Sequence, residues 1–360
     1  MRSLRERWIA VRNRLIADPR FQRIAARLPG TRTIARGHAG RLFDLVAGFT
    51  YSQILLAFVQ LELADWLAGG PQPAAALANR ANLSQDAADR LLRAATALGL
   101  AERLADGRYA LGLAGAALRG NPGIAAMVAH HPMLYADLAD PVALLRNGRG
   151  QGELGRFWSY AGAAPGGDAA AYSALMTASQ ALVGSHVVEA YRFARHRRML
   201  DIGGGEGRFL ETVAASAPQL ALGLFDLPQV AARAATRLGE RISVHPGDFS
   251  QDPLPPGHDL ITLIRVLHDH DDAVAQALLV KIRAALSPGG RLLIAEPMAE
   301  TRGAEAAGDG YFGLYLWAMG SGRPRSANEL RAMLAQAGFA TVREIDTPIP
   351  LTVRILVATA

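Results

Sequence analysis

The stretch Asp201-Ile202-Gly203-Gly204-Gly205-Glu206-Gly207 decides how the second half of this 360-residue sequence folds. Its first two residues end a short apolar run, residues 199–202, and it opens into an amphipathic segment, residues 208–216. Glycine lets the backbone turn sharply and lets a ligand approach the chain closely. A strand, a glycine loop and a helix in this order are typical of the ligand-binding turn of an α/β sheet.

The acidic residue that follows the next strand is Asp226. Its carboxylate can accept hydrogen bonds from the two ribose hydroxyls of an adenosine. A dehydrogenase loop reads G-x-G-x-x-G, which would put the third glycine at Arg208, so the observed D-x-G-x-G-x-G spacing disfavours NAD. The spacing resembles that of class I methyltransferases, which use S-adenosyl-L-methionine. This resemblance implies that Gly203, Gly205 and Gly207 bind that cofactor.

After residue 194 the sequence alternates between short β-like runs and amphipathic helices, which is typical of a doubly wound parallel sheet. The five runs are residues 199–202, 220–225, 242–245, 260–264 and 291–295. Two closing segments, residues 341–346 and 354–358, are expected to pair as an antiparallel hairpin. We therefore predict an α/β fold, a class I methyltransferase Rossmann-like sheet, over residues 186–360.

Further candidate cofactor contacts lie after the third and fourth strands of this pattern. Asp248 can meet the adenine amino group, and the ring of Phe249 can cover the adenine face. A core aromatic explains Phe249, taken alone, equally well. Arg265 follows the fourth strand and is placed with these cofactor contacts.

His268 stands near the carboxyl end of the fourth strand, where the side chains of a parallel sheet face the ligand crevice. Histidine ordinarily titrates near neutrality, which suits the removal of a proton from a hydroxyl group, so we predict that His268 is the general base. His268 and His270 could also be taken for metal ligands, but the sequence has no cysteine and no third ligand nearby. We therefore expect no metal site.

Several stretches resemble the plant-type small-molecule O-methyltransferase family, which includes acetylserotonin and bacterial polyketide enzymes. These stretches are residues 200–207, 225–228, 247–249, 267–269 and 295–297. The resemblance implies that His268 is the base and that Glu296 orients it or contacts the substrate. The family often has a tryptophan where this chain has His270, and it tends to place a second acid where this chain has Pro324. A histidine held by one acid rather than two suits a different acceptor.

Within this family, the sequence is similar to the bacterial hydroxycarotenoid branch, the demethylspheroidene or hydroxyneurosporene O-methyltransferases of purple phototrophs. The similarity rests on residues 43–53, 265–272, 296–298 and 308–323. It implies methylation of the tertiary 1-hydroxyl of an acyclic carotenoid. A phenolic or polyketide acceptor, and C-methylation in bacteriochlorophyll synthesis, are alternatives because one fold serves many acceptors.

The stretch 308–323 is rich in aromatic and methionine side chains at helical spacing. A core stripe explains such a run as well as the wall of a substrate pocket does, and an apolar C40 acceptor needs such a wall. The candidate substrate contacts are Met176, Asp309, Phe312, Trp317 and Met319.

Residues 42–185 are expected to form a helical dimerisation domain with a winged-helix module and linker helices. Ser84 can cap a helix, and Asp106-Gly107 can join two short apolar segments as a tight hairpin. A recognition helix offers several basic or amide side chains to base edges, whereas residues 85–98 offer mainly two arginines. We therefore expect a homodimer and no nucleic-acid partner. A winged-helix regulator that only senses the cofactor is the alternative from a different class.

Residues 1–41 carry eleven arginines against two acidic residues, a net charge of +9, whereas the whole chain carries +6. Apolar residues recur at helical spacing between these arginines, at Leu4, Trp8, Val11 and Leu15. This basic arm either packs on the body or on a partner subunit, or attaches peripherally to an anionic membrane surface. The absence of cysteine excludes disulfides and fits a reducing cytoplasm. We expect a cytoplasmic protein, with peripheral attachment to the inner or intracytoplasmic membrane as the second reading.

Overall fold

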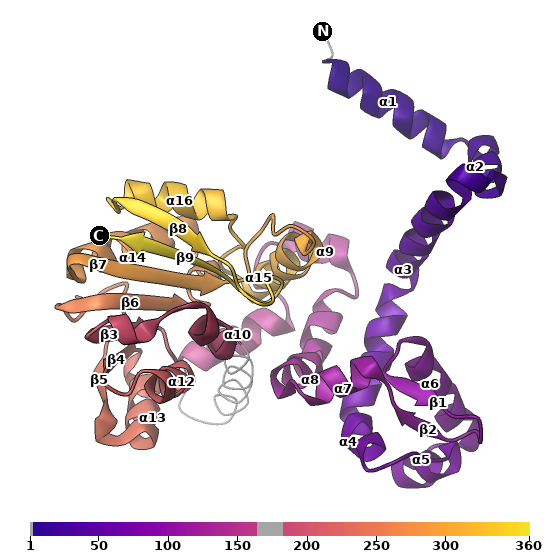
Figure 1. Ribbon diagram of the computed structural model, residues 1–360, viewed down its shortest axis with the longest axis horizontal. Helices are drawn as coiled ribbons and strands as arrows, with labels where there is room; N and C mark the ends of the chain where they lie inside the picture. The colour runs from indigo at the N-terminus through magenta and orange to yellow at the C-terminus, as the bar shows by residue number, and fades with distance from the viewer. Residues whose placement is uncertain (1–2, 164–182) are drawn as a thin grey trace. The chain divides into compact units, whose positions relative to one another are not determined.

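The computed structural model describes residues 3–163 and 183–360, and the predicted substrate contact Met176 lies outside them (Figure 1). Contacts divide the chain into two compact units, Met1–Ala117 and Leu118–Ala360. This division differs from the predicted domain boundaries at residues 41/42 and 185/186. The first of these falls inside one continuous helix, because no proline interrupts the sequence between residues 30 and 60.

The first unit begins with three consecutive helices, α1 (Leu4–Ala17), α2 (Pro19–Arg27) and α3 (Pro29–Gln60). Ser3 and Glu6 form a capping box at the start of α1. The Asp18 carboxylate accepts a hydrogen bond from the Arg20 N–H at the start of α2. A proline at the first position of α2 and of α3 costs no helical hydrogen bond, because that N–H has no partner inside the helix. The helix predicted around residues 4–15 is present as α1, and its apolar side chains are exposed.

Helix α3 has a long apolar surface. Among the described helices it is the one that is long and apolar enough to cross a membrane by length and composition, and 11 % of its most apolar window is buried. Its exposed apolar side chains include Leu42, Phe43, Leu45, Val46 and Phe49. A contiguous exposed apolar face of this kind marks an interaction surface.

The rest of the first unit shows the predicted helix, helix and hairpin. Its elements are α4 (Leu63–Ala68), α5 (Ala74–Ala81), α6 (Gln85–Ala97), β1 (Ala101–Arg103), β2 (Tyr109–Leu111) and the start of α7 (Leu113–Arg119). The Ser84 hydroxyl accepts a hydrogen bond from the Ala87 N–H and caps α6, as predicted. Gly107 has a φ of +85° in the turn between β1 and β2, which pair antiparallel.

Seven strands form one sheet in the second unit, in the order β5-β4-β3-β6-β7-β9-β8. The strands are β3 (Arg198–Ile202), β4 (Ala221–Asp226), β5 (Ile242–Pro246), β6 (His258–Ile264), β7 (Leu286–Glu296), β8 (Thr341–Ile345) and β9 (Arg354–Thr359). The first five in this order are parallel, and β9 pairs antiparallel with both β7 and β8. The structure confirms the predicted doubly wound sheet and its closing hairpin.

Helices cover both faces of this sheet (Figure 1). One face packs against α14 (Asp272–Ala285) and α16 (Ala327–Gln336), and the other against residues 183–190, α12 (Arg208–Ser216) and α13 (Pro228–Leu238). Successive strand residues alternate between the two cores: Leu292 belongs to the first and Leu293 to the second. Burial on both sides explains why these strands read as continuous apolar runs.

Before residues 183–190, this unit contains the helices α8 (Pro122–Asp137), α9 (Pro141–Asn147) and α10 (Glu153–Ala163). The Asp137 carboxylate accepts hydrogen bonds from the N–H groups of Glu153, at 2.6 Å, and Leu154, at 3.0 Å, and so fixes the start of α10. Helices α8 and α10 pack against α15 (Gly313–Met319), which follows a π-helical turn, Ala306–Phe312.

The strand order reverses at β3, which lies between β4 and β6. The loops that leave the carboxyl ends of β3 and β6 therefore meet at one edge of the sheet, where open α/β sheets bind their ligands. These two loops contain the glycine stretch and the predicted base.

Candidate active site

The glycine loop after β3 has a backbone that other residues would not tolerate. Gly203, Gly205 and Gly207 have φ angles of 68°, 59° and 78°, in the left-handed region that favours glycine. A Cβ on Gly204 would collide with Oδ2 of Asp201. The loop therefore turns tightly against the protein interior, with Gly203 and Gly205 partly exposed, and forms a cradle without side chains that a ligand can approach closely.

Asp226, the predicted ribose-binding acid at the end of β4, lies against this cradle. Its Oδ2 accepts a hydrogen bond from the Gly205 N–H at 2.8 Å, and its Oδ1 accepts one from the Leu227 N–H at 2.7 Å. Each carboxylate oxygen has two lone pairs, so each can still accept one ligand hydroxyl. Burial raises the pKa of Asp226 to about 6.

A second acid, Asp201, lies under the loop and was not among the predicted site residues. It is fully buried, and the Thr262 hydroxyl donates to its Oδ1 at 2.6 Å. Its Oδ2 has no hydrogen-bond partner within the described residues. Burial raises the pKa of Asp201 to about 7. The available sequence signal was the acid that opens D-x-G-x-G-x-G.

The predicted adenine contacts, Asp248 and Phe249, follow β5 as expected. The Asp248 carboxylate accepts hydrogen bonds from the Ser250 N–H and from the Gln251 side chain, and so fixes the turn. The half-buried Phe249 ring meets the His270 ring edge to face, with centroids 5.1 Å apart. His270, at the position where the related family often has tryptophan, thus packs directly on the predicted adenine-covering ring.

The base loop, residues 265–270, follows β6. Arg265 has a φ of 58°, and its N–H donates to the carbonyl oxygen of Ala295 at 2.8 Å. The next turn, Leu267–Asp269, places His268 in the interior with 2 % of its surface exposed. The His268 backbone N–H donates to Oε2 of Glu296 at 3.2 Å. The structure therefore brings the predicted base and its predicted acid together.

Two acidic side chains, Glu296 and Asp269, lie next to His268. Burial raises the pKa of Glu296, although His268 and Arg325 nearby act to lower it. Burial would also raise the pKa of Asp269, but the neighbouring His268 and Arg265 hold that pKa below its usual range. Asp269 Oδ1 lies 3.1 Å from Nε2 of His268.

Three buried polar atoms at this site have no hydrogen-bond partner in the part of the chain that the structure describes. They are Nδ1 of His268, Oε1 of Glu296 and Nε of Arg265. Buried polar groups without partners are rare in folded proteins and call for an explanation. A bound cofactor and acceptor at this edge of the sheet would supply partners.

A pocket opens beside His268. Its lining residues are Trp158, Arg265, His268, Asp269, Phe312, Tyr315 and Leu316. The ring of Phe312 lies 5.9 Å from the His268 ring, so this predicted substrate contact faces the base.

The other described candidates for substrate contact do not line this pocket. The Trp317 indole donates to the carbonyl oxygen of Leu144, and Met319 is buried against α8 to α10. The Asp309 carboxylate accepts a hydrogen bond from the Glu300 N–H at 3.1 Å. These three side chains stabilise the fold around the pocket.

The sequence reasoning missed the polar pairs behind the pocket wall. His130 Nε2 lies 3.1 Å from the Tyr315 hydroxyl, and His131 Nε2 lies 2.9 Å from the Tyr311 hydroxyl. Burial, together with His130, lowers the pKa of His131 to about 4, and burial raises the pKa of Tyr315 to about 12. The pairs are therefore neutral near pH 7. Adjacent histidines in an otherwise apolar helix were the signal.

Comparisons with known proteins agree with this geometry. The O-methyltransferase domain family matches residues 135–340, and the O-methyltransferase dimerisation domain family matches residues 43–118. The chain is 42 % identical to the demethylspheroidene O-methyltransferase of Rhodobacter capsulatus, over 96 % of this chain and 88 % of that protein. It is 44 % identical to that of Cereibacter sphaeroides, over 92 % of this chain and 89 % of that protein.

Solved structures show the same fold. Human N-acetylserotonin methyltransferase in complex with SAM matches with a TM-score of 0.74 and 26 % identity, over 89 % of this chain and 97 % of that chain. CalO1, a methyltransferase in calicheamicin biosynthesis with bound SAH, matches with a TM-score of 0.76 and 27 % identity, over 89 % and 98 %.

Proposed function

The chain belongs to the S-adenosylmethionine-dependent O-methyltransferase family, and from this premise we propose that it methylates the tertiary 1-hydroxyl of an acyclic hydroxycarotenoid. Family membership confirms the predicted enzyme class, the class I fold and the cofactor. The acceptor proposal is carried by the 42–44 % identity to two demethylspheroidene enzymes over most of the chain. The relatives that act on 3-amino-4-hydroxybenzoate and on acetylserotonin are 31 % and 33 % identical.

The glycine loop fits the cofactor, because its three left-handed glycines carry no side chain that would keep a ligand from the backbone, and Asp226 beside it can still accept ligand hydroxyls. Asp226 would hold the ribose hydroxyls, Asp248 and Phe249 the adenine, and Arg265 the amino-acid part. When bound, S-adenosylmethionine supplies an electrophilic methyl group on its sulfonium. The protein's remaining task is to hold an acceptor hydroxyl in line with that group and to remove its proton.

In this proposal the imidazole of His268 accepts the proton from the acceptor hydroxyl while the new oxygen–carbon bond forms. A tertiary alcohol is a weak acid, so its proton leaves within the transition state rather than before it. Nε2 of His268 faces the Asp269 carboxylate, which favours the tautomer with the proton on Nε2 and leaves the lone pair on Nδ1, an atom buried without a partner among the described residues. Glu296 holds the His268 backbone through its N–H. The ionised Asp269, 3.1 Å from Nε2, stabilises the imidazolium that results.

The pocket wall is mixed: charged side chains, Arg265 and Asp269, lie beside an apolar part. Phe312, Leu316 and Trp158 contribute mainly carbon surface beside His268. The histidine and tyrosine pairs behind this wall are neutral near pH 7, so no charge there requires a polar substrate. The cofactor-sensing regulator is disfavoured, because the chain belongs to a family of enzymes and the exposed face of α6 offers few basic side chains.

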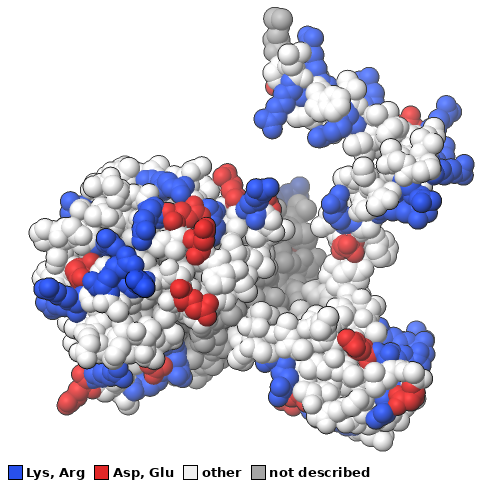
Figure 2. Space-filling view, in the orientation of Figure 1, with Lys and Arg blue, Asp and Glu red and all other residues white. Residues whose placement is uncertain are grey.

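The dimerisation-domain match supports a homodimer. For residues 1–28, the part of the basic arm that precedes α3, we propose peripheral contact with an anionic membrane on the cytoplasmic side. Leu4, Trp8 and Val11 are 86 %, 64 % and 60 % exposed. Figure 2 shows basic side chains gathered over α1 and α2. Exposed apolar and arginine side chains on one helix suit the headgroup region of a bilayer. The acyl chains of the same bilayer dissolve carotenoids.

The experiment that tests this function uses labelled S-adenosylmethionine and a panel of 1-hydroxyneurosporene, a catechol and a bacteriochlorophyllide. We expect labelled product from 1-hydroxyneurosporene at a kcat/KM at least a hundredfold above that of either other acceptor. Preferential methylation of the catechol, or of the bacteriochlorophyllide, would replace the carotenoid by that acceptor class.

A further inference from the structure

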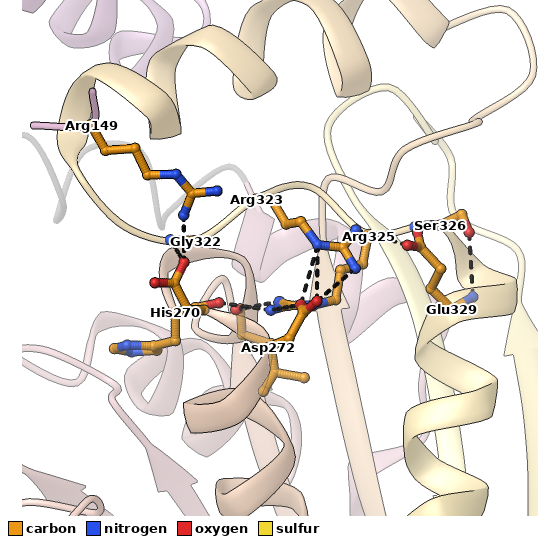
Figure 3. Close-up of polar contacts among 10 residues, drawn as sticks. Arg149, His270, Asp272, Gly322, Arg323, Arg325, Ser326 and Glu329 are labelled. Atoms are coloured by element: carbon orange, nitrogen blue, oxygen red, sulfur yellow. Dashed lines mark hydrogen bonds and ion pairs between the residues drawn. The ribbon is translucent and has the colours of Figure 1, made fainter. Parts of the chain in front are cut away.

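The base loop is held by a segment that lies 52 to 58 residues later in the sequence (Figure 3). We call residues 321–325 the clamp segment. It donates hydrogen bonds to four consecutive carbonyl oxygens of the base loop. The contacts are Arg325 Nη1 to Leu267 at 2.7 Å, Arg323 N to His268 at 2.9 Å, Ser321 Oγ to Asp269 at 2.7 Å and Arg325 Nη2 to His270 at 2.7 Å.

The backbone of the clamp segment lies directly against the backbone of the base loop. Gly322 has a φ of 77°, and a Cβ there would collide with the carbonyl oxygen of His268 and lie 2.6 Å from the carbonyl carbon of Asp269. The Gly322 N–H also donates to Oδ1 of Asp271 at 3.1 Å. Glycine at this position therefore lets the two segments run in direct contact.

Arg325 is the centre of the contact and is fully buried. A buried charge is tolerated only when it is paired and hydrogen-bonded. Asp272 Oδ1 supplies the opposite charge, 2.8 Å from Nη2 and 3.0 Å from Nε. The planar guanidinium then spans the carbonyl oxygens of Leu267 and His270, which stand on either side of His268.

The same segment continues from the wall of the pocket. Helix α15, which carries the pocket residues Tyr315 and Leu316, ends at Gly320, and the clamp segment follows directly. The chain that lines the pocket therefore leads directly into the hydrogen bonds that hold the base loop.

We propose that the clamp segment, through Arg325 and Ser321, positions His268 for proton removal and aligns it with the pocket wall. The proposal rests on the proposed role of His268 as the base. It also accounts for Pro324, which occupies the place where the related family tends to have a second acid. Here the backbone of the base loop is held through its carbonyl groups, in addition to the Asp269 carboxylate that lies on the His268 ring.

Arg325→Lys separates positioning from charge. Lysine keeps the positive charge next to Asp272, but its single nitrogen cannot span the two carbonyl oxygens that the guanidinium joins. A misplacement of a catalytic group by 1 Å can cost about a hundredfold in rate. We expect kcat to fall about 10- to 100-fold, with the dissociation constant of S-adenosylmethionine unchanged within twofold.

The milder variant Ser321→Ala removes one hydrogen bond of the clamp. We expect kcat to fall about three- to tenfold. The matched control is Arg331→Lys, because Arg331 pairs with Glu344 on the surface of α16 and should leave both constants unchanged.

Amide hydrogen exchange gives a readout that needs no acceptor. In Arg325→Lys and in Ser321→Ala, exchange at residues 267–270 should rise at least tenfold, whereas peptides of β4 and β6 should keep the exchange rates of the parent protein. Parent-like kcat and exchange in both variants would overturn the proposal, and so would a loss of cofactor affinity equal to the loss of kcat. If Arg325→Lys does not fold, Ser321→Ala decides alone.

The two proposals fail in different ways. Full activity of His268→Ala would remove the base itself and with it the proposed mechanism. An inactive His268→Ala together with unaffected clamp variants would overturn the clamp segment alone.

Discussion

The glycine loop and the base loop leave neighbouring strands of one sheet, yet they are held in place differently. In the glycine loop, left-handed glycine conformations and two backbone N–H groups on Asp226 fix the geometry, all within 25 residues of sequence. In the base loop, carbonyl groups are held by Arg325 and Ser321, more than 50 residues away. The first loop is built by its own sequence, and the second depends on tertiary contacts.

The largest effect that separates the two loops is expected for His268→Ala. The variant should lower kcat by roughly 100- to 10,000-fold, which is the range for general acid–base catalysis. Calorimetry should find a parent-like affinity for S-adenosylmethionine, because the glycine loop is untouched. The control is His38→Ala, an exposed histidine of α3 outside the site. A loss of cofactor affinity as large as the loss of kcat would show that the two loops do not act separately.

Asp226→Asn should have a smaller effect, which falls on cofactor binding instead of on kcat. Cofactor binding should weaken about 10- to 100-fold, since a hydrogen bond to a charged group contributes about 1.5–3 kcal/mol, while kcat at saturating cofactor stays within threefold. Because burial raises the pKa of Asp226 to about 6, the carboxylate is protonated below that pH and loses its ability to accept both ribose hydroxyls. The parent dissociation constant should therefore rise as the pH falls through about 6. If the dissociation constant of Asp226→Asn showed the same rise at low pH, the ribose assignment would be contradicted.

Gly204→Ala tests whether the close packing of the glycine loop requires a glycine at this position. The added Cβ would collide with Asp201 Oδ2 and lie 2.6 Å from Cδ1 of Leu224. We expect the free energy of unfolding in urea to fall by about 1–3 kcal/mol. Gly310→Ala is the control, because no atom lies within 4 Å of the position that its methyl group would take, and its stability should change by less than about 0.5 kcal/mol. Equal stability of the two variants would show that the loop tolerates a side chain.

The smallest effect on catalysis is expected from removal of residues 1–28, which leaves α3 complete. Binding to vesicles that contain phosphatidylglycerol should fall at least tenfold, with kcat on detergent-solubilised acceptor unchanged within twofold, since both loops lie in the second unit. Replacement of Arg5, Arg7, Arg12 and Arg14 by glutamine should reproduce the loss of vesicle binding and make it independent of salt. Unchanged vesicle binding, or loss of activity in detergent, would assign the arm to subunit packing.

The same contrast explains how much the sequence could predict. Local patterns predicted the strands, the Ser84 cap and the approach of Asp226 to the glycine loop, because each depends on residues that are close in sequence or on the fixed geometry of parallel strands. The partners of Arg325 could not be predicted, since they depend on which distant segments meet in the core.

The aromatic stripe shows the same limit. Phe312 and Trp317 share helical spacing with apolar neighbours, but only the folded structure shows that Phe312 faces His268 while Trp317 packs against α9. Likewise, the D-x-G-x-G-x-G spacing marks Asp201, but only the folded structure shows that its burial leaves one carboxylate oxygen without a partner among the described residues.

Above all, we propose that His268 directs methyl transfer to the oxygen of a tertiary carotenoid alcohol. The most direct test is carbon-13 NMR of the product formed from 1-hydroxyneurosporene and S-adenosylmethionine labelled on its methyl group. We predict one labelled methoxy group at C-1 with the parent protein, and at least a hundredfold less of it with His268→Ala. A labelled methyl group bonded to carbon instead of oxygen would contradict this role of His268. Parent-like methoxy formation by His268→Ala would contradict it as well.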